Sequence, residues 1–261
     1  MNLPEFFNEL KKRNPVFFWF GWFNVVLFAI AFVLFFTDAT IISGINAWIK
    51  PSKFAVSIII YSWTFGWILW YLPDSGNRKI ITWVITICML VENCLIFMQA
   101  FRGVRSHFNI TSAFDGIIFS VMGLFIMINT MIVLYTVILF FVKKIDIDST
   151  MLFAWRAGLV LFFLGGISGG MMSAILSHTI HGLDDGPALP YINWSTVAGD
   201  VRSAHFFTLH GLQLIPLAAF IFLKTSFEKA RTLTILFAVA YTSFCLWLHW
   251  LAFNGLPLIS F

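Results

Sequence analysis

The sequence predicts an all-α, polytopic membrane protein with seven transmembrane helices, folded as a single membrane domain over residues 1–261. Hydrophobic residues make up 60% of the chain and charged residues 11%, against about 45–50% and about 25% in soluble globular domains. The mean hydropathy is +0.90. The apolar residues also occur in runs of about 20 or more, the length that a helix needs to cross a bilayer. These observations exclude a soluble enzyme, a disordered chain, a nucleic-acid-binding protein and an outer-membrane β-barrel, whose strands would alternate apolar and polar residues.

The breaks between the apolar runs have the composition of loops. Residues 73–79 form a turn cluster, residues 143–149 form a charged hairpin, and residues 179–202 form a long loop rich in Gly, Pro and Asp. The predicted spans cover about residues 16–36, 54–72, 79–101, 114–142, 151–178, 203–223 and 232–253.

The distribution of Lys and Arg predicts the orientation of these spans. Ten of the cationic residues fall on one side of the membrane and five on the other, and Arg156 lies just inside the fifth span, which accounts for all 16. Because cytoplasmic loops carry the excess of Lys and Arg, the N-terminus is predicted to be cytoplasmic and the C-terminus external. The formal charge of +4 therefore reports topology rather than a phosphate-binding surface.

The six histidines all lie at or near the predicted external face. His178 and His181 are three residues apart, so both would project from one face of a helix if the fifth span continued that far. His205 and His210 are five apart, which rotates them by about 140° on a regular helix. His210 shares a face with Gln213 and lies about 7.5 Å deeper than His205, so it is the more buried candidate. An interhelical hydrogen bond is the alternative role for His210.

A polar stripe follows the third span. Cys88, Glu92 and Gln99 recur at helical spacing on one face. Glu92 lies past the middle of the span, where an ionisable group is costly unless it faces the interior of the bundle, so its default interpretation is functional. A protonated glutamic acid hydrogen-bonded to a neighbouring helix is the structural alternative. Asp200 and Arg202 add charges at the start of the sixth span, where Asp200 also suits a helix N-cap.

Glycines gather in the fifth span at positions 165, 166, 169 and 170. Small residues at this spacing let another helix approach closely. Their bare backbone could equally leave room for a flat ligand such as haem, and the sequence leaves both interpretations open.

Three stretches, at residues 48–54, 99–109 and 199–213, resemble runs in uncharacterised bacterial seven-span inner-membrane proteins. Those proteins have no established activity, so the resemblance implies a fold and a location in a bacterial inner membrane, and no function. The seven-span zinc hydrolases of the ceramidase and progestin-receptor type pair two histidines four residues apart in their final helix. Here the seventh span has only His249, which argues against that assignment.

The histidines support a first class of function, in which the protein binds a haem or a metal ion near the external face. Neutral imidazole is the commonest metal ligand and an axial ligand of haem. His178 or His181 would face His210, with Glu92 as a further ligand, and electron transfer with a quinone would be the natural role. For a bare ion, copper or zinc suits imidazole-rich sites. The candidate metal ligands are His107, His178, His181, His205, His210, His249 and Glu92.

Glu92 supports a second class, a proton-linked or small-molecule transporter or a ligand sensor. The external polar residues would then form the mouth of the pathway, with Asp200, Arg202, Gln213 and Gln99 as additional candidates. No internal repeat is evident, which argues against a two-repeat carrier but not against a sensor. A membrane assembly partner without chemistry is a third possibility. The sequence leaves open whether a reaction is catalysed and which oligomer forms.

Overall fold

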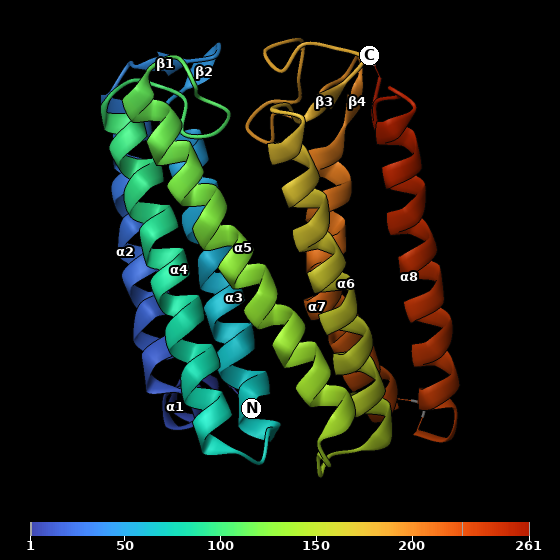
Figure 1. Cartoon of the computed structure of the whole chain (residues 1–261). Helices are drawn as coiled ribbons and strands as arrows, with labels where there is room; N and C mark the ends of the chain where they lie inside the picture. The colour runs from blue at the N-terminus through green and yellow to red at the C-terminus, as the bar shows by residue number, and fades with distance from the viewer. Residues whose placement is uncertain (1, 226, 261) are drawn as a thin grey trace. The chain divides into compact units, whose positions relative to one another are not determined.

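The computed structural model describes residues 2–225 and 227–260, with only the backbone described for Phe227. Within these ranges the chain forms eight α-helices, seven of them long and apolar enough to cross a membrane (Figure 1). The protein is therefore an all-α, multi-pass membrane protein whose helices contact the lipid bilayer. The membrane helices are α2 (Pro15–Thr37), α3 (Ile49–Ile68), α4 (Ser75–Phe101), α5 (Ala113–Val142), α6 (Ser149–Ala174), α7 (Val201–Thr225) and α8 (Ala230–Phe253).

The remaining elements are short. The amphipathic helix α1 (Leu3–Arg13) precedes the first membrane helix, and two 3-10 turns, Leu69–Tyr71 and Phe227–Lys229, lie next to membrane helices. Strand β1 (Ile41–Ile42) pairs antiparallel with β2 (Ile45–Asn46), and β3 (Thr179–Ile180) pairs antiparallel with β4 (Gly199–Asp200).

Helix α6 ends earlier than the sequence predicts, four residues before His178. Leu176 adopts a left-handed conformation with φ 54°. This lets the Ser177 N–H donate to the carbonyl oxygen of Met172, which closes the helix with a Schellman-type cap. His178 then lies just before β3, and His181 follows it with φ 59°. The prediction that a continuing helix carries both histidines on one face is therefore wrong.

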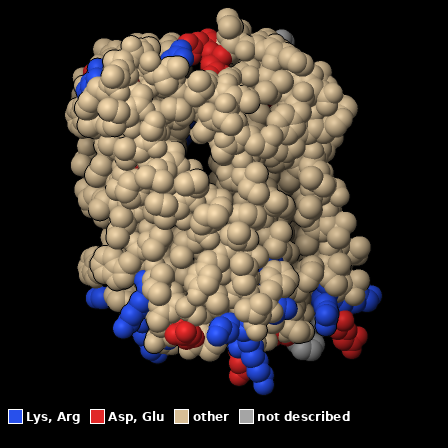
Figure 2. Space-filling model, in the orientation of Figure 1, with Lys and Arg blue, Asp and Glu red and all other residues tan. Residues whose placement is uncertain are grey.

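Contacts between Cα atoms divide the chain into two compact units, Met1–Ile132 (unit 1) and Val133–Phe261 (unit 2), with the boundary inside α5. In unit 2, six of the seven Lys and Arg residues lie towards the end that carries the loop 143–148, whereas in unit 1 five lie at the end that carries α1 and four at the other end (Figure 2). The asymmetry on which the orientation prediction depends is therefore found mainly in unit 2. The prediction of one membrane domain over the whole chain stays a prediction.

In unit 1, helix α1 packs against the neighbouring membrane helices. Asn2 caps the helix through a reciprocal pair of hydrogen bonds with Glu5, which satisfies the first free N–H groups. Leu10 on the apolar face is fully buried, and the Phe6 ring stacks on Trp67 of α3 with 5.2 Å between centroids. The hydrophobic face of α1 is thus buried against the unit.

In unit 2, helices α6 and α7 pack together through glycines. A Cβ atom on Gly158 would come within 2.9 Å of the α7 backbone, and one on Gly165 within 2.8 Å of the Leu209 side chain. A Cβ atom on Gly169 would come within 3.0 Å of the His205 ring. Close helix approach is therefore confirmed for Gly165, and Gly169 leaves room for the His205 ring of α7.

Candidate functional site

Glu92 is the least exposed acidic side chain among the described residues, with 1% of its surface accessible. Its two carboxyl oxygens are buried and have no hydrogen-bond partner within the described part of the chain. Nine residues separate it from the end of α4 at Phe101, which places it about 13.5 Å below that end. An uncompensated carboxylate is costly to bury at this depth. Glu92 is therefore the acidic group of unit 1 that the fold leaves unsatisfied.

Further polar side chains lie below Glu92, towards the middle of α4. Cys88 lies one turn away, is buried, and is within electrostatic range of both Glu92 and Tyr61. The Tyr61 hydroxyl donates a hydrogen bond of 3.0 Å to Asn129 Oδ1 of α5. Three helices of unit 1 thus contribute polar groups at this level.

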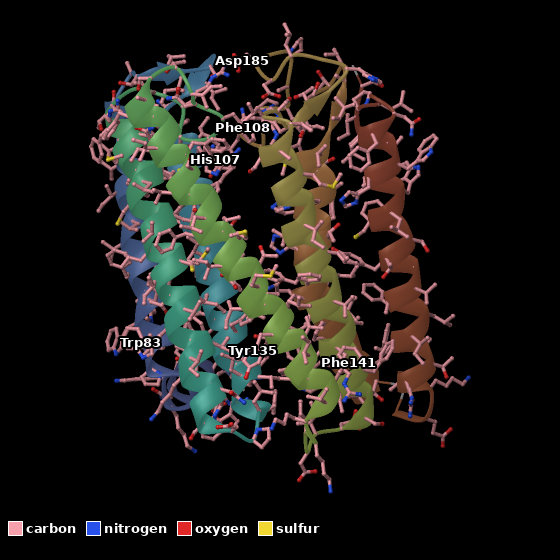
Figure 3. All side chains as sticks on the ribbon, in the orientation of Figure 1. Trp83, His107, Phe108, Tyr135, Phe141 and Asp185 are labelled. Carbon is pink, nitrogen blue, oxygen red and sulfur yellow. The ribbon has the colours of Figure 1, made fainter. Side chains whose placement is uncertain are left out.

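Above Glu92, His107 and Lys50 lie towards the predicted external end of unit 1. Lys50 is within electrostatic range of both Glu92 and His107. The half-buried His107 ring packs 5.7 Å from the Phe54 ring and lies beside Phe108 (Figure 3). Burial, reinforced by the positive charge of Lys50, holds the pKa of His107 well below its usual value. His107 is therefore expected to be neutral at physiological pH.

Buried polar contacts continue along α4 on both sides of the acid. At one end Asn14 Nδ2 donates to Thr82 Oγ1 over 2.8 Å, and near the middle Asn93 donates to Asn24 of α2. At the other end Gln99 Nε2 donates to a carboxylate of α5 over 3.0 Å. The distance from Thr82 to Gln99 is about 25 Å along the helix, most of the hydrocarbon thickness of about 30 Å. Polar side chains thus follow α4 through the membrane.

The acceptor for Gln99 is Asp115, a residue that sequence reasoning missed. Its carboxylate also accepts a hydrogen bond of 2.6 Å from Ser112 Oγ and forms an ion pair of 2.6 Å with Arg102. The Asp115 N–H donates back to Ser112 Oγ over 3.1 Å. The spacing of Ser112 and Asp115 before an apolar run is the signature of a helix cap, and this signal could have located the residue.

In unit 2, the loop residues near the predicted external end are held by two aspartates. Asp184 Oδ1 lies 3.2 Å from His178 Nδ1 and accepts a hydrogen bond of 2.8 Å from Ser177 Oγ. The buried Asp200 pairs with Arg202 over 2.6 Å and accepts a hydrogen bond of 3.0 Å from the Arg202 N–H. The N-cap interpretation of Asp200 is confirmed.

The other histidines of unit 2 lie in different surroundings. The His210 ring packs 4.4 Å from the Phe206 ring and is within hydrogen-bonding range of Gln213. The His181 ring lies against Gly255. His205 and His249 each place Nδ1 2.8 Å from a main-chain carbonyl oxygen.

No group of three or more His, Cys, Asp or Glu side chains is placed to hold a metal ion within residues 2–225 and 227–260. Glu92 and His107 belong to unit 1, and His178, His205 and His249 are among the histidines of unit 2. The predicted ligands therefore do not gather into one shell inside either unit.

Comparisons with protein-family models, with curated proteins and with solved structures find no match for the chain. Its function has to be argued from its own residues.

Proposed function

We propose that this protein is a proton-linked membrane transporter in which Glu92 takes up and releases the proton. The observation that carries the proposal is the complete burial of both carboxyl oxygens of Glu92 without a hydrogen-bond partner in the described chain. Ionisable residues inside membrane helices are rare and mark proton or ion pathways in most cases. A carboxyl group that is neutral when buried can lose its proton only when water or a polar group reaches it.

The polar side chains around Glu92 support a route for that proton. Lys50 and the neutral His107 lie towards the predicted external end, and a neutral imidazole can accept a proton on one nitrogen and release it from the other. Cys88 lies one turn of α4 to the other side of the acid and is within electrostatic range of Tyr61. A proton route inside unit 1 does not require an internal repeat, and none is evident in the sequence.

Proton flux into liposomes that contain the purified protein tests this proposal. Under an imposed pH gradient, Glu92→Gln is expected to reduce the flux by about 100-fold, the order that a proton-transferring group contributes. The exposed Glu228 provides the matched control, and Glu228→Gln should carry the same flux as the parent protein.

Infrared difference spectra give a second measurement. The parent protein should show a protonated-carboxyl band that changes with pH, and Glu92→Gln should lack it. Unchanged flux and an unchanged band in Glu92→Gln would contradict the proposal. A band that responds to an added ligand without any flux would instead favour the ligand sensor.

The haem, copper or zinc hypothesis remains a second candidate. Within unit 2 it is favoured by the orientation of two imidazole rings, those of His205 and His249. The pairing of His178 or His181 with His210, the part of Glu92 as a ligand, and a quinone partner remain predictions. We propose a bacterial inner membrane as the location, supported by the Lys and Arg distribution and by the resemblance of three stretches.

A further inference from the structure

Two histidines of unit 2 share one hydrogen-bonding arrangement. His205 Nδ1 on α7 lies 2.8 Å from the carbonyl oxygen of Gly165, and His249 Nδ1 on α8 lies 2.8 Å from the carbonyl oxygen of Cys245. A carbonyl oxygen only accepts, so each Nδ1 carries the proton and each Nε2 presents its lone pair. Metal-binding histidines are commonly oriented in this way, with the second ring nitrogen donating to a backbone carbonyl.

The packing of α7 against α8 brings these two rings to the same level. Thr208 of α7 and Cys245 of α8 lie within hydrogen-bonding range of each other. The helices run in opposite directions, so one turn outward from this contact leads to His205 on α7 and to His249 on α8. His205 is also within electrostatic range of His249.

The His205 ring packs closely against α6. Gly169 has no side chain, and a Cβ atom there would come within 3.0 Å of His205 Cε1. Ser168 Oγ lies 3.1 Å from His205 Nδ1 and adds a second acceptor for its proton. Both rings are only partly buried, and neither Nε2 has a hydrogen-bond partner in the described chain.

We propose that His205 and His249 form a two-imidazole site for a transition-metal centre between α7 and α8. Imidazole suits iron, copper and zinc. The metal is either the iron of a haem or a bare copper or zinc ion, which the Nε2 atoms of the two rings would hold. This pair differs from the predicted one, and the site does not depend on Glu92.

Binding of three separate probes tests the site on the purified full chain: haemin, copper(I) and zinc(II). The parent protein should bind one of them, and His205→Gln and His249→Gln should each weaken that binding more than about tenfold. His178→Gln separates this site from the predicted pairing of His178 with His210, and it should bind as the parent does because His178 Nδ1 lies against Asp184. Glu92→Gln should also bind normally.

Spectra of the bound probes distinguish a haem iron from a bare copper or zinc ion. Bound haemin should give the low-spin spectrum of a bis-imidazole iron, which becomes high-spin in either single variant. A bare ion should instead show two imidazole nitrogens by X-ray absorption, and one nitrogen in either variant.

A milder change keeps the test usable if the glutamine variants do not fold. Gly169→Ala leaves both imidazoles in place but pushes on the His205 ring, so it should weaken binding measurably. The proposal is overturned if the parent protein binds none of the three probes. It is also overturned if a folded double variant, His205→Gln with His249→Gln, binds as tightly as the parent.

Discussion

The most extended set of interhelical contacts differs between the two units. In unit 1, polar side chains meet at several levels of α4, from Thr82 through Asn93 to Gln99. In unit 2, helices α6 and α7 close on each other through Gly158 and Gly165. Glycine contacts serve close packing, whereas buried polar groups are costly unless they are satisfied or used. The contrast indicates that the membrane-buried part of unit 1 holds polar groups available for chemistry, whereas that of unit 2 serves close packing of its helices.

The candidate site residues of unit 2 lie instead near one end of its helices. Asp184, Asp200 and Arg202 hold the loop there, and His205 and His249 lie within the first or last two turns of α7 and α8. A proton site in mid-membrane and a metal site near a surface would thus belong to separate units. Variants of one unit should leave the chemistry of the other unchanged.

The largest stability effect is expected from the glycine contacts of unit 2. Gly158→Leu places a side chain where a Cβ atom alone would already lie 2.9 Å from the Leu212 Cα atom. A backbone atom cannot rotate away, so we expect a loss of about 3 kcal/mol in the free energy of unfolding. Denaturation in mixed micelles measures it.

Gly170→Leu is the control for this variant, since nothing lies within 4 Å of a Cβ atom built on Gly170 of the same helix. It should unfold like the parent protein. Equal losses in the two variants would mean that α6 does not depend on its glycines for packing, and the contrast between the units would fail.

The membrane spans could be predicted because a bilayer demands long apolar runs, and hydropathy measures that demand directly. The ends of the spans follow other rules. Helix α3, the second membrane span, starts at Ile49 rather than at residue 54. Pro51 lies in its first turn, where a missing N–H costs nothing. Helix α6 stops because Leu176 takes a left-handed conformation, which no apolar pattern encodes.

The candidate sites show a similar limit. Glu92 could be found from sequence because an acid inside an apolar run is conspicuous by residue type alone. The pairing of His205 with His249 depends on which faces α7 and α8 turn to each other, and on carbonyl groups at Gly165 and Cys245. Helical spacing within one span favours His210 over His205 as the more buried residue. That spacing carries no information about the neighbouring helix, so it could not identify His249 as the partner.

A smaller effect is expected from the polar contacts of unit 1. Asn24→Ala removes the acceptor of the Asn93 amide, and both residues are fully buried. A buried donor without its partner costs about 1–3 kcal/mol, and membrane hydrogen bonds fall near the lower end of that range. We therefore expect the free energy of unfolding to fall by about 1 kcal/mol.

A double-mutant cycle gives the control for this pair. Replacing both asparagines by alanine removes the donor together with the acceptor, so this double variant should lose less than the sum of Asn24→Ala and Asn93→Ala. Strictly additive losses would show that the contact contributes nothing, and the polar packing of unit 1 would then have to be explained by the proton route alone.

The smallest effect concerns the loops near the predicted external face, which hold an aspartate in each unit. Burial raises the pKa of Asp184, but the charge of His178 and hydrogen bonds to the carboxylate lower it more, so the net pKa lies below its usual value. Hydrogen bonds from Thr40 and Trp48 lower the pKa of Asp38. The lowered pKa of Asp184 in unit 2 is thus partly caused by a charge, whereas that of Asp38 in unit 1 is caused by hydrogen bonds.

A carboxyl group with a lowered pKa stabilises the fold above its unfolded pKa of about 4, and that contribution is lost as the pH falls through the lower, folded value. In the parent protein, the free energy of unfolding of unit 2 should therefore fall as the pH is lowered through this range. Asp184→Asn should reduce that fall by less than about 1 kcal/mol. Added salt should weaken the contribution of Asp184 more than that of Asp38, because salt screens the His178 charge. Unfolding at several pH values and salt concentrations measures both, with the exposed Asp146→Asn as the control. An acid limb that responds equally to salt in both units would show that His178 contributes no charge to the loop.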